Sequence, residues 1–258
     1  MMMLLIDAGN TRIKWSLVQG KDWLRSGVLP VAQANELSRH LAGHCDPSTG
    51  PGQALPGISL HDIGQVWVSN VAGEEVARHI RNVGVNRNAQ LHFVVAQQEQ
   101  CGVRNGYSRA GQLGSDRWAA LLGAWHLVRG ECLVVNCGTA TTIDALSAQG
   151  EFKGGLILPG LELMQSSLVT TTAILAPGRG EYVPFPKNTA DAMFSGAVQA
   201  SCGAIQRQHA LLDNDTAPVV LSGGAAGVLR EHIRMPLRIV ENLILHGLLI
   251  IAQEAGGT

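Results

Sequence analysis

The first half of the chain contains short apolar runs, many of which alternate with polar residues, and this period of two is typical of half-buried strands. Apolar residues spaced three and four apart lie between some of these runs and predict helices. Residues 43–57 are instead rich in Gly and Pro, which predicts an exposed insertion. We predict strands at residues 5–7, 13–18, 25–29, 65–71 and 91–95, and helices at residues 34–41 and 74–83.

The second half repeats this order, because strands again come before most of the helices. Its last apolar run, residues 243–252, is too short to cross a bilayer and predicts a buried helix. Strands followed by helices, twice over, favour mixed sheets covered by helices over a uniform series of parallel units. We predict a hairpin that starts at Cys132 and returns through residues 143–146, strands at residues 152–160 and 218–222, and helices at residues 115–129, 161–169 and 191–212.

Residues 5–11 and 134–142 read like copies of one another. In each, an apolar strand ends in Asp7 or in the amide Asn136, and a small residue, a glycine and a hydroxyl residue follow. The shift along the chain that carries Asp7 to Asn136 also carries Gly9 to Gly138. An ordinary tight hairpin turn would explain either segment alone. As a pair, the segments predict two phosphate-binding turns and a duplicated nucleotide-binding fold.

Both turns have the chemistry that phosphate binding needs. Glycine lets a phosphate oxygen approach backbone N–H groups without meeting a Cβ, and Thr11 and Thr139 add hydroxyl donors. Asp7, at the end of its strand, is placed to hold a magnesium ion through water. Each turn leads into another strand, so neither is the strand-to-helix P-loop.

Composition and charge narrow the class of protein. The chain has 258 residues, of which 46% are hydrophobic and 15% charged, enough for two domains with separate cores. A formal net charge of −1 provides no electrostatic footprint for nucleic acid or an anionic membrane surface. We see no secretory signal peptide, and five scattered cysteines without metal-like spacing fit reduced thiols. We therefore expect a cytoplasmic protein without nucleic-acid or membrane partners.

The stretch Gly-Ser-Asp-Arg at residues 114–117 lies between the two turns. Phosphoryl transfer to an alcohol needs a carboxylate that accepts the hydroxyl proton, and Asp116 fits that role. Arg117 can pair with a carboxylate or with a phosphate oxygen. The alternative is a helix N-cap, with Ser115 or Asp116 at the cap, and the two interpretations are compatible.

The turn from Asp7 to Thr11, the Gly-Ser-Asp-Arg stretch and residues 138–142 occur in the order and approximate spacing of type III pantothenate kinases, which the chain resembles over nearly its whole length. That family belongs to the superfamily of acetate and sugar kinases, heat-shock chaperones and actin. The resemblance implies an α/β fold of two duplicated actin-like (ribonuclease H-like) domains, residues 1–113 and 114–258, with mixed β-sheets flanked by helices. It also implies phosphorylation of pantothenate to 4′-phosphopantothenate with ATP and Mg²⁺, the first step of coenzyme A biosynthesis.

The resemblance implies roles for individual residues as well. Asp116 is the implied catalytic base, and Lys14 reaches the phosphates as a point charge. Asn136 stands where the family usually has an aspartate linked to a monovalent cation such as K⁺ or NH₄⁺; an amide oxygen can ligate a cation but adds no charge. Gly223 and Gly224 are implied to lie near adenosine. The residues implied to lie near the ATP phosphates are Asp7, Ala8, Gly9, Asn10, Thr11, Arg12, Ile13, Lys14, Gly138 and Thr139.

Thr189 resembles a threonine that reaches pantothenate across the family's dimer interface, so the resemblance implies a homodimer. The alternative is that Thr189 is the N-cap of the helix that follows. The family commonly has proline where this chain has Ala110, three residues after Tyr107. Two other functions remain open, an accessory factor for a transcription regulator and a kinase that acts on acetate or a sugar. The residues implied to contact pantothenate are Tyr107, Gly114, Ser115, Asp116, Arg117 and Thr189.

Overall fold

The computed structural model describes residues 1–42, 60–83, 88–171, 178 and 180–256, so the insertion predicted at residues 43–57 lies outside the described residues. The chain forms two compact units, each built from segments that are not continuous in sequence. The first combines residues 1–96, 111–119 and 244–258, and the second combines residues 97–110 and 120–243. A domain boundary between residues 113 and 114 stays a prediction.

The first unit is built on a five-stranded sheet. Its strands are β1 (Met2–Ala8), β2 (Arg12–Gln19), β3 (Asp22–Pro30), β4 (Ile63–Asn70) and β5 (Gln90–Phe93). They lie in the order β3-β2-β1-β4-β5. The first three form an antiparallel meander, and β4 and β5 continue the sheet parallel to β1.

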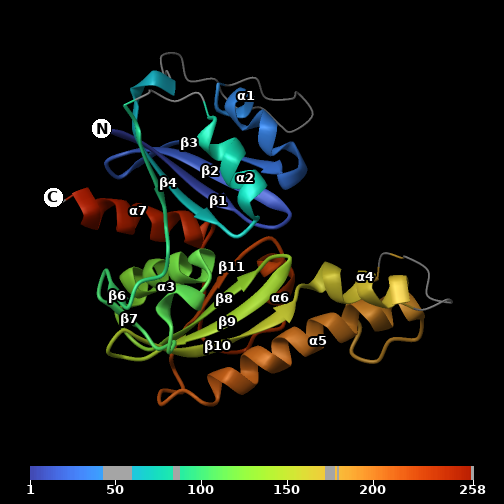
Figure 1. The fold of residues 1–258 in the computed structure, drawn as a ribbon. Coiled ribbons are helices and arrows are strands. Elements are labelled where there is room, and N and C mark those ends of the chain that lie inside the picture. The colour runs from blue at the N-terminus through green and yellow to red at the C-terminus, as the bar shows by residue number, and fades with distance from the viewer. Residues whose placement is uncertain (43–59, 84–87, 172–177, 179, 257–258) are drawn as a thin grey trace. The chain divides into compact units, whose positions relative to one another are not determined.

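Alternation along β1 explains how this sheet forms its core. Leu4 and Ile6 face one side, where they pack with residues of the two helices that cover it, whereas Asp7 faces the other side. Figure 1 shows both covering helices over the same face of the sheet. The helical segments of this unit are two 3₁₀ helices (Val31–Glu36 and Leu60–Asp62), α1 (Leu37–Leu41), α2 (Glu74–Arg81), the start of α3 (Ser115–Val128) and most of α7 (Leu243–Gly256).

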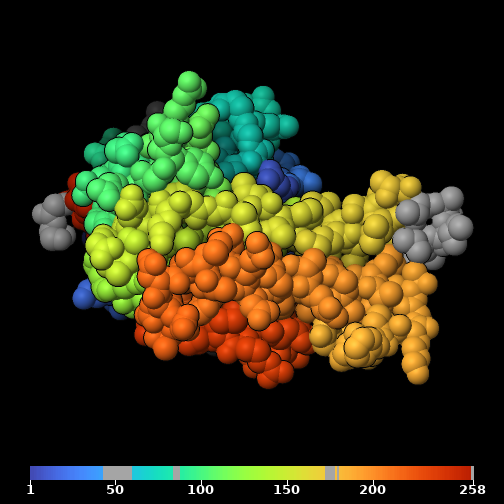
Figure 2. Space-filling view, turned by 90° about the horizontal axis from the view of Figure 1, so that it is seen from below, coloured from blue at the N-terminus to red at the C-terminus, as the bar shows by residue number. Residues whose placement is uncertain are grey.

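The second unit is built on a seven-stranded sheet. Its strands are β6 (Glu99–Gln100), β7 (Val103–Asn105), β8 (Cys132–Cys137), β9 (Ala140–Leu146), β10 (Glu151–Pro159), β11 (Val219–Ser222) and β12 (Leu237–Ile239). They lie in the order β12-β11-β8-β9-β10-β7-β6. The helices are most of α3 (Ser115–Val128), with α4 (Leu161–Thr171), α5 (Thr189–His209) and α6 (Ala226–Leu229). Figure 2 shows β10 and α4 (yellow) beside α5 (orange) on the face in view.

The two sheets share one topology. β8, β9 and β10 form an antiparallel meander like β1, β2 and β3, and β11 and β12 continue the sheet in parallel as β4 and β5 do. The two turns that look alike in the sequence therefore lie in equivalent hairpins of the two sheets, β1–β2 and β8–β9. The duplicated α/β fold with mixed sheets flanked by helices is confirmed.

The local differences from the predicted elements are small. The helix predicted at residues 34–41 begins earlier, as a 3₁₀ helix at Val31, and becomes α-helical only at Leu37. The short strands β6, β7 and β12 and the single-turn helix α6 were not predicted, because two to four residues are too few to show a periodicity. No helix among the described residues is long and apolar enough to span a membrane.

Candidate functional site

The first phosphate turn is a tight hairpin between β1 and β2. The Gly9 N–H donates to the Arg12 carbonyl at 3.0 Å, which closes the turn, and Asn10, Thr11 and Arg12 are exposed at its tip. Ala8 and Ile13 are fully buried beneath it and anchor the two strands in the core. Asn10 also borders an open hollow of about 480 Å³ that residues of the 3₁₀ helix and α2 complete. The tip of the turn is therefore exposed, while its base is anchored in the core.

Asp7 is a buried carboxylate at the centre of the first sheet. It pairs across the strands with Lys14 on β2 and with Ser69 on β4, and its exposed fraction is 8%. Burial raises its pKa from 3.8 to about 7, the positive charge of Lys14 opposes that rise, and the negative charge of Asp116 adds to it. Asp7 thus lies in the electrostatic range of two of the other predicted site residues.

Asp116 lies in the first turn of α3, and its Oδ1 accepts a hydrogen bond of 2.8 Å from the Arg117 N–H. The carbonyl of Gly114 accepts the first helical bond of α3, from the Trp118 N–H at 2.9 Å, so Gly114 occupies the N-cap position. The interpretation of Ser115 or Asp116 as the N-cap is therefore wrong. Asp116 still satisfies an N–H group that the helix leaves without a partner.

Glycine at position 114 is what leaves room for the Asp116 carboxylate. A Cβ there would lie 2.6 Å from Asp116 Oδ1 and 3.9 Å from a Val71 methyl group. The contact at 2.6 Å is closer than atoms of this kind approach, so a larger residue would displace the carboxylate. Position 114 therefore determines where the carboxylate of Asp116 lies.

A pair of buried serines links the β4 strand end to the start of α3. The Ser69 and Ser115 hydroxyl oxygens are 2.9 Å apart, and both residues are less than a tenth exposed. Ser69 neighbours Asp7 in the sheet and Ser115 precedes Asp116, so this bond joins the strand end beside Asp7 to the residue before Asp116. The sequence did not single out Ser69; its only signal was its place at the end of a buried strand, in register with Asp7.

The second phosphate turn is clamped by two glycines from elsewhere in its unit. The Gly138 N–H donates to the Ala140 carbonyl at 3.0 Å, and the Gly160 N–H donates to the Thr139 carbonyl at 2.8 Å. Gly223 has a φ of +100°, and a Cβ there would lie 2.5 Å from the Cys137 carbonyl oxygen. Gly138 and Thr139 themselves are exposed. Gly160 and Gly223 therefore pack against the turn, while its own residues Gly138 and Thr139 stay exposed.

Asn136 and Cys137 end the strand that leads into this turn. Asn136 is half-buried and lies in register with Ser222 on β11 and Thr142 on β9, so its two neighbours across the strands carry neutral hydroxyl groups. Cys137 is fully buried, and burial raises the pKa of its thiol to about 12. With its pKa raised so far, this thiol stays protonated near neutral pH, and burial shields it from reagents in solution.

Tyr107 and Thr189 lie in different parts of the second unit. Tyr107 is half-buried in the loop after β7, and its ring lies 5.3 Å from the ring of Phe152. Thr189 is the exposed first residue of α5. Its alternative role as the N-cap is wrong, because Asn188 has the extended backbone of a cap and its Oδ1 accepts from the Asp191 N–H at 2.9 Å.

The first unit therefore brings together the predicted phosphate turn, a lysine and two carboxylates, a set of groups that phosphoryl transfer can use. The donor set fits Mg²⁺, because this ion binds through one or two carboxylates and keeps waters and phosphate oxygens as its other ligands. A metal site formed by protein side chains alone needs more ligands than these two carboxylates. No group of three or more His, Cys, Asp or Glu side chains that could hold a metal ion occurs among the described residues.

Comparisons with known proteins show the family to which the chain belongs. The family model of type III pantothenate kinase matches residues 3–210. A type III pantothenate kinase of Nitrosospira multiformis is 43% identical over 100% of this chain and 93% of that protein. A protein of Campylobacter jejuni assigned to the Baf family of transcriptional activators has a similar structure, with a TM-score of 0.64, 20% identity, and coverage of 99% of this chain and 100% of that one.

A second solved structure has the same fold. MreB 5 of Spiroplasma citri, solved with AMPPNP bound, has a TM-score of 0.51 at 10% identity and covers 99% of this chain and 97% of that one. At such identities the structural likeness shows the actin-like fold alone, whereas the family model and the Nitrosospira relative are specific. The chain belongs to the type III pantothenate kinase family.

Proposed function

We propose that this protein transfers the γ-phosphoryl group of ATP to the 4′-hydroxyl of pantothenate and so catalyses the first step of coenzyme A biosynthesis. The observation that carries the proposal is that the negative charge of Asp116 acts on Asp7 within one unit, in a chain that belongs to this kinase family. An accessory role for a transcription regulator and a kinase activity on acetate or a sugar are not favoured, because the relatives with specific sequence similarity are pantothenate kinases.

Asp116 is the proposed general base. Its Oδ1 accepts the Arg117 N–H, so we assign Oδ2 to the hydroxyl proton of pantothenate. As the new O–P bond forms, the proton passes to Asp116 and the bond between the γ-phosphorus and the bridging oxygen breaks, with ADP as the leaving group. The first-turn geometry of α3 and the absence of a Cβ at Gly114 hold the carboxylate for this step.

The proposed phosphate contacts come from both hairpins. In the first, residues 8–13 supply backbone and hydroxyl donors and Lys14 supplies a positive charge. Asp7, through water, and the oxygens of the nucleotide phosphates would hold Mg²⁺, which would offset phosphate charge when bound. A cation beside Asp7 favours its ionised form and so counters the effect of burial on its pKa. In the second hairpin, the exposed residues Gly138 and Thr139 are assigned to the phosphates, and Gly223 and Gly224 are assigned to adenosine.

Asn136 is the proposed site of a monovalent cation. Its amide oxygen and the neighbouring hydroxyl groups of Thr142 and Ser222 are neutral ligands, so K⁺ or NH₄⁺ would be held without a counter-charge from position 136. We therefore assign a weak dependence on monovalent cations to this protein.

Pantothenate is assigned to Tyr107, to residues 114–117 and to Thr189. Arg117 is the residue we assign to the pantothenate carboxylate, because its guanidinium can form two parallel hydrogen bonds. Thr189 reaches the substrate of a second copy in this proposal, which makes the protein a homodimer. Large apolar side chains exposed on and around α4 and α5 support such an interface. They are Ile157, Leu163, Leu168, Phe185 and Leu211.

We place the protein in the cytoplasm, where ATP and pantothenate are both present; free cysteines among the described residues are consistent with a reducing compartment. The test of the whole proposal is ADP production with pantothenate, acetate and hexoses offered in turn. We expect ADP only with pantothenate, together with a product heavier by one phosphoryl group. ADP production with acetate or a hexose, or none with pantothenate, would overturn it.

A further inference from the structure

Asn105, the last residue of β7, is a buried polar residue to which no role has been given above. It is 2% exposed, and both the Nδ2 and the Oδ1 atoms of its side chain form hydrogen bonds. Nδ2 donates to the Gln97 carbonyl at 3.2 Å and to the Ala110 carbonyl at 3.3 Å. Oδ1 accepts from the Tyr107 N–H at 3.0 Å. The Asn105 amide thus connects three parts of the chain: Gln97 before the loop, Tyr107 within it, and Ala110 where it ends.

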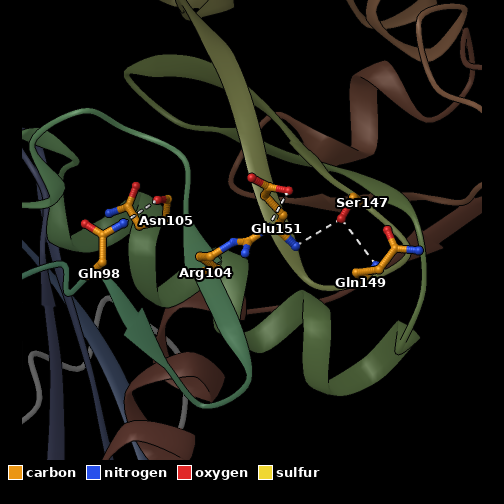
Figure 3. Close-up of polar contacts among 6 residues, drawn as sticks. All are labelled: Gln98, Arg104, Asn105, Ser147, Gln149 and Glu151. Atoms are coloured by element: carbon orange, nitrogen blue, oxygen red, sulfur yellow. Dashed lines mark hydrogen bonds and ion pairs between the residues drawn. The ribbon is translucent and has the colours of Figure 1, made fainter.

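The backbone of Asn105 adds a reciprocal pair of bonds with Gln98. The Asn105 N–H donates to the Gln98 carbonyl at 2.9 Å, and Gln98 Nε2 donates to the Asn105 carbonyl at 3.2 Å. Figure 3 shows the Gln98 side chain pointing toward Asn105, with this second bond as a dashed line. A buried amide costs free energy when its donors and acceptors lack partners. Any other conformation of the Asn105 side chain would break these bonds, so the side chain is held in this one.

The other side of the loop rests on the sheet. Asn105 is in register with Phe152 on β10, and a Cβ at Gly106 would collide with the Phe152 carbonyl oxygen. One residue back, Arg104 forms an ion pair of 2.9 Å with Glu151 on the same strand (Figure 3). The Tyr107 ring then packs at 36° to the Phe152 ring. The loop from Gly106 therefore starts from a fixed point with a fixed direction.

We propose that Asn105 is a positioning residue for pantothenate binding, and that it acts by holding Tyr107 in its binding arrangement. The proposal rests on the proposed function, in which Tyr107 contacts pantothenate. The Asn105 side chain closes an Asx turn over Tyr107 and ties both ends of the loop to itself, so Tyr107 is ordered before the substrate arrives. Without the amide, substrate binding has to order the loop, and apparent affinity falls.

The first experiment compares Asn105→Ala and Asn105→Asp with the wild type in steady-state kinetics. Aspartate keeps the shape but replaces the Nδ2 donors by an oxygen that faces two carbonyl oxygens. We expect KM for pantothenate to rise about tenfold with each variant, a loss on the scale of one or two hydrogen bonds, while KM for ATP and kcat change much less. Equal losses for both substrates would indicate a general structural role and overturn the proposal.

The matched control is Asn214→Ala. Asn214 closes the same kind of turn, because its Oδ1 accepts the Thr216 N–H at 2.9 Å, but it lies in an exposed loop. We expect this variant to keep the wild-type KM for pantothenate. If it raises that KM as much as Asn105→Ala does, the effect is not specific to the Tyr107 loop and the proposal fails. Should Asn105→Ala not fold, Asn105→Asp and Gln98→Ala carry the test, with a smaller rise expected for Gln98→Ala.

A double-mutant cycle with Tyr107→Ala separates this proposal from the proposed function. If Asn105 acts through Tyr107, Asn105→Ala adds little to the KM of a Tyr107→Ala enzyme. Additive effects would show that Asn105 acts by another route and would contradict the proposal. If Tyr107→Ala alone leaves the KM for pantothenate unchanged, the assignment of Tyr107 fails, and this proposal fails with it.

Hydrogen exchange provides a readout that does not depend on catalysis. In the wild type the Tyr107 N–H donates to Asn105, so we expect it to be protected, and Asn105→Ala to remove that protection. If exchange accelerates while the KM for pantothenate stays the same, Asn105 orders the loop without any effect on binding. The positioning proposal would then be wrong, while the proposed phosphorylation of pantothenate would stand.

Discussion

Replacing Asp7 by asparagine should abolish activity and yet stabilise the fold at neutral and alkaline pH. Asp7 is 8% exposed and in register with Lys14 and Ser69, and burial raises its pKa from 3.8 to about 7. Between these two pH values the folded protein binds a proton that the unfolded chain has lost. The folded state therefore loses stability relative to the unfolded chain as pH rises through that window. Asparagine has the same shape and never ionises.

The size of the effect follows from the shift. From 3.8 to about 7 it corresponds to about 4 kcal/mol over the whole window, at about 1.4 kcal/mol per pKa unit. Near pH 5 part of this cost is already present, so the gain from Asp7→Asn should be about 2 to 3 kcal/mol larger near pH 8 than near pH 5. The raised pKa already includes the opposing charge of Lys14, and bound Mg²⁺ would lower the cost further.

The assay is urea unfolding of both proteins near pH 5 and pH 8, in buffer with EDTA so that no divalent cation is present. The control is Asp213→Asn, since the Asp213 side chain is 89% exposed and its substitution should give no pH-dependent gain. A gain for Asp7→Asn that is equal at the two pH values, or a loss of stability near pH 8, would refute the reasoning about burial.

Three further predictions concern single positions. Gly114→Ala should displace the Asp116 carboxylate and lower kcat about tenfold or more, with little change in the unfolding temperature; an unchanged kcat would contradict the positioning argument. Asn136→Asp should increase the stimulation of the rate by KCl over tetramethylammonium chloride, because it adds a charge at the assigned cation site; equal stimulation in the two enzymes would count against that assignment. Cys137 should resist maleimide in the native protein and react only in denaturant, as mass spectrometry of the labelled peptide would show.

The sequence was sufficient for the fold because the signals for it are local and repeated. Short apolar runs in β1, β2 and β4 predict strands, and the matching turns at Gly9 and Gly138 predict that the two halves share a fold. The shared strand order of the two sheets confirms this. Local patterns cannot show register, however, so the neighbours of Asp7 in the sheet became known only from the structure.

The candidate site was predicted only in part, because local patterns show its motifs but not the contacts between distant residues. Asp7 and Asp116 stand in recognisable motifs, but the hydrogen bond between Ser69 and Ser115 joins residues far apart in sequence and has no local pattern. The helix caps show a different limit. Asn188 and Thr189 are adjacent and both favour the N-cap, and only the extended backbone of Asn188 decides between them. Asn105, likewise, shows its role only through the contacts of its buried amide.

The central claim is that Asp116 accepts the hydroxyl proton of pantothenate. The most direct test measures pantothenate-dependent ADP production and the mass of the product for Asp116→Asn, with exposed Asp213→Asn as the control. Asparagine keeps the oxygen that accepts the Arg117 N–H but cannot take up the proton, so we predict that kcat falls by about two to four orders of magnitude while the fold is retained. An Asp116→Asn enzyme that forms phosphopantothenate at the wild-type rate would contradict the account.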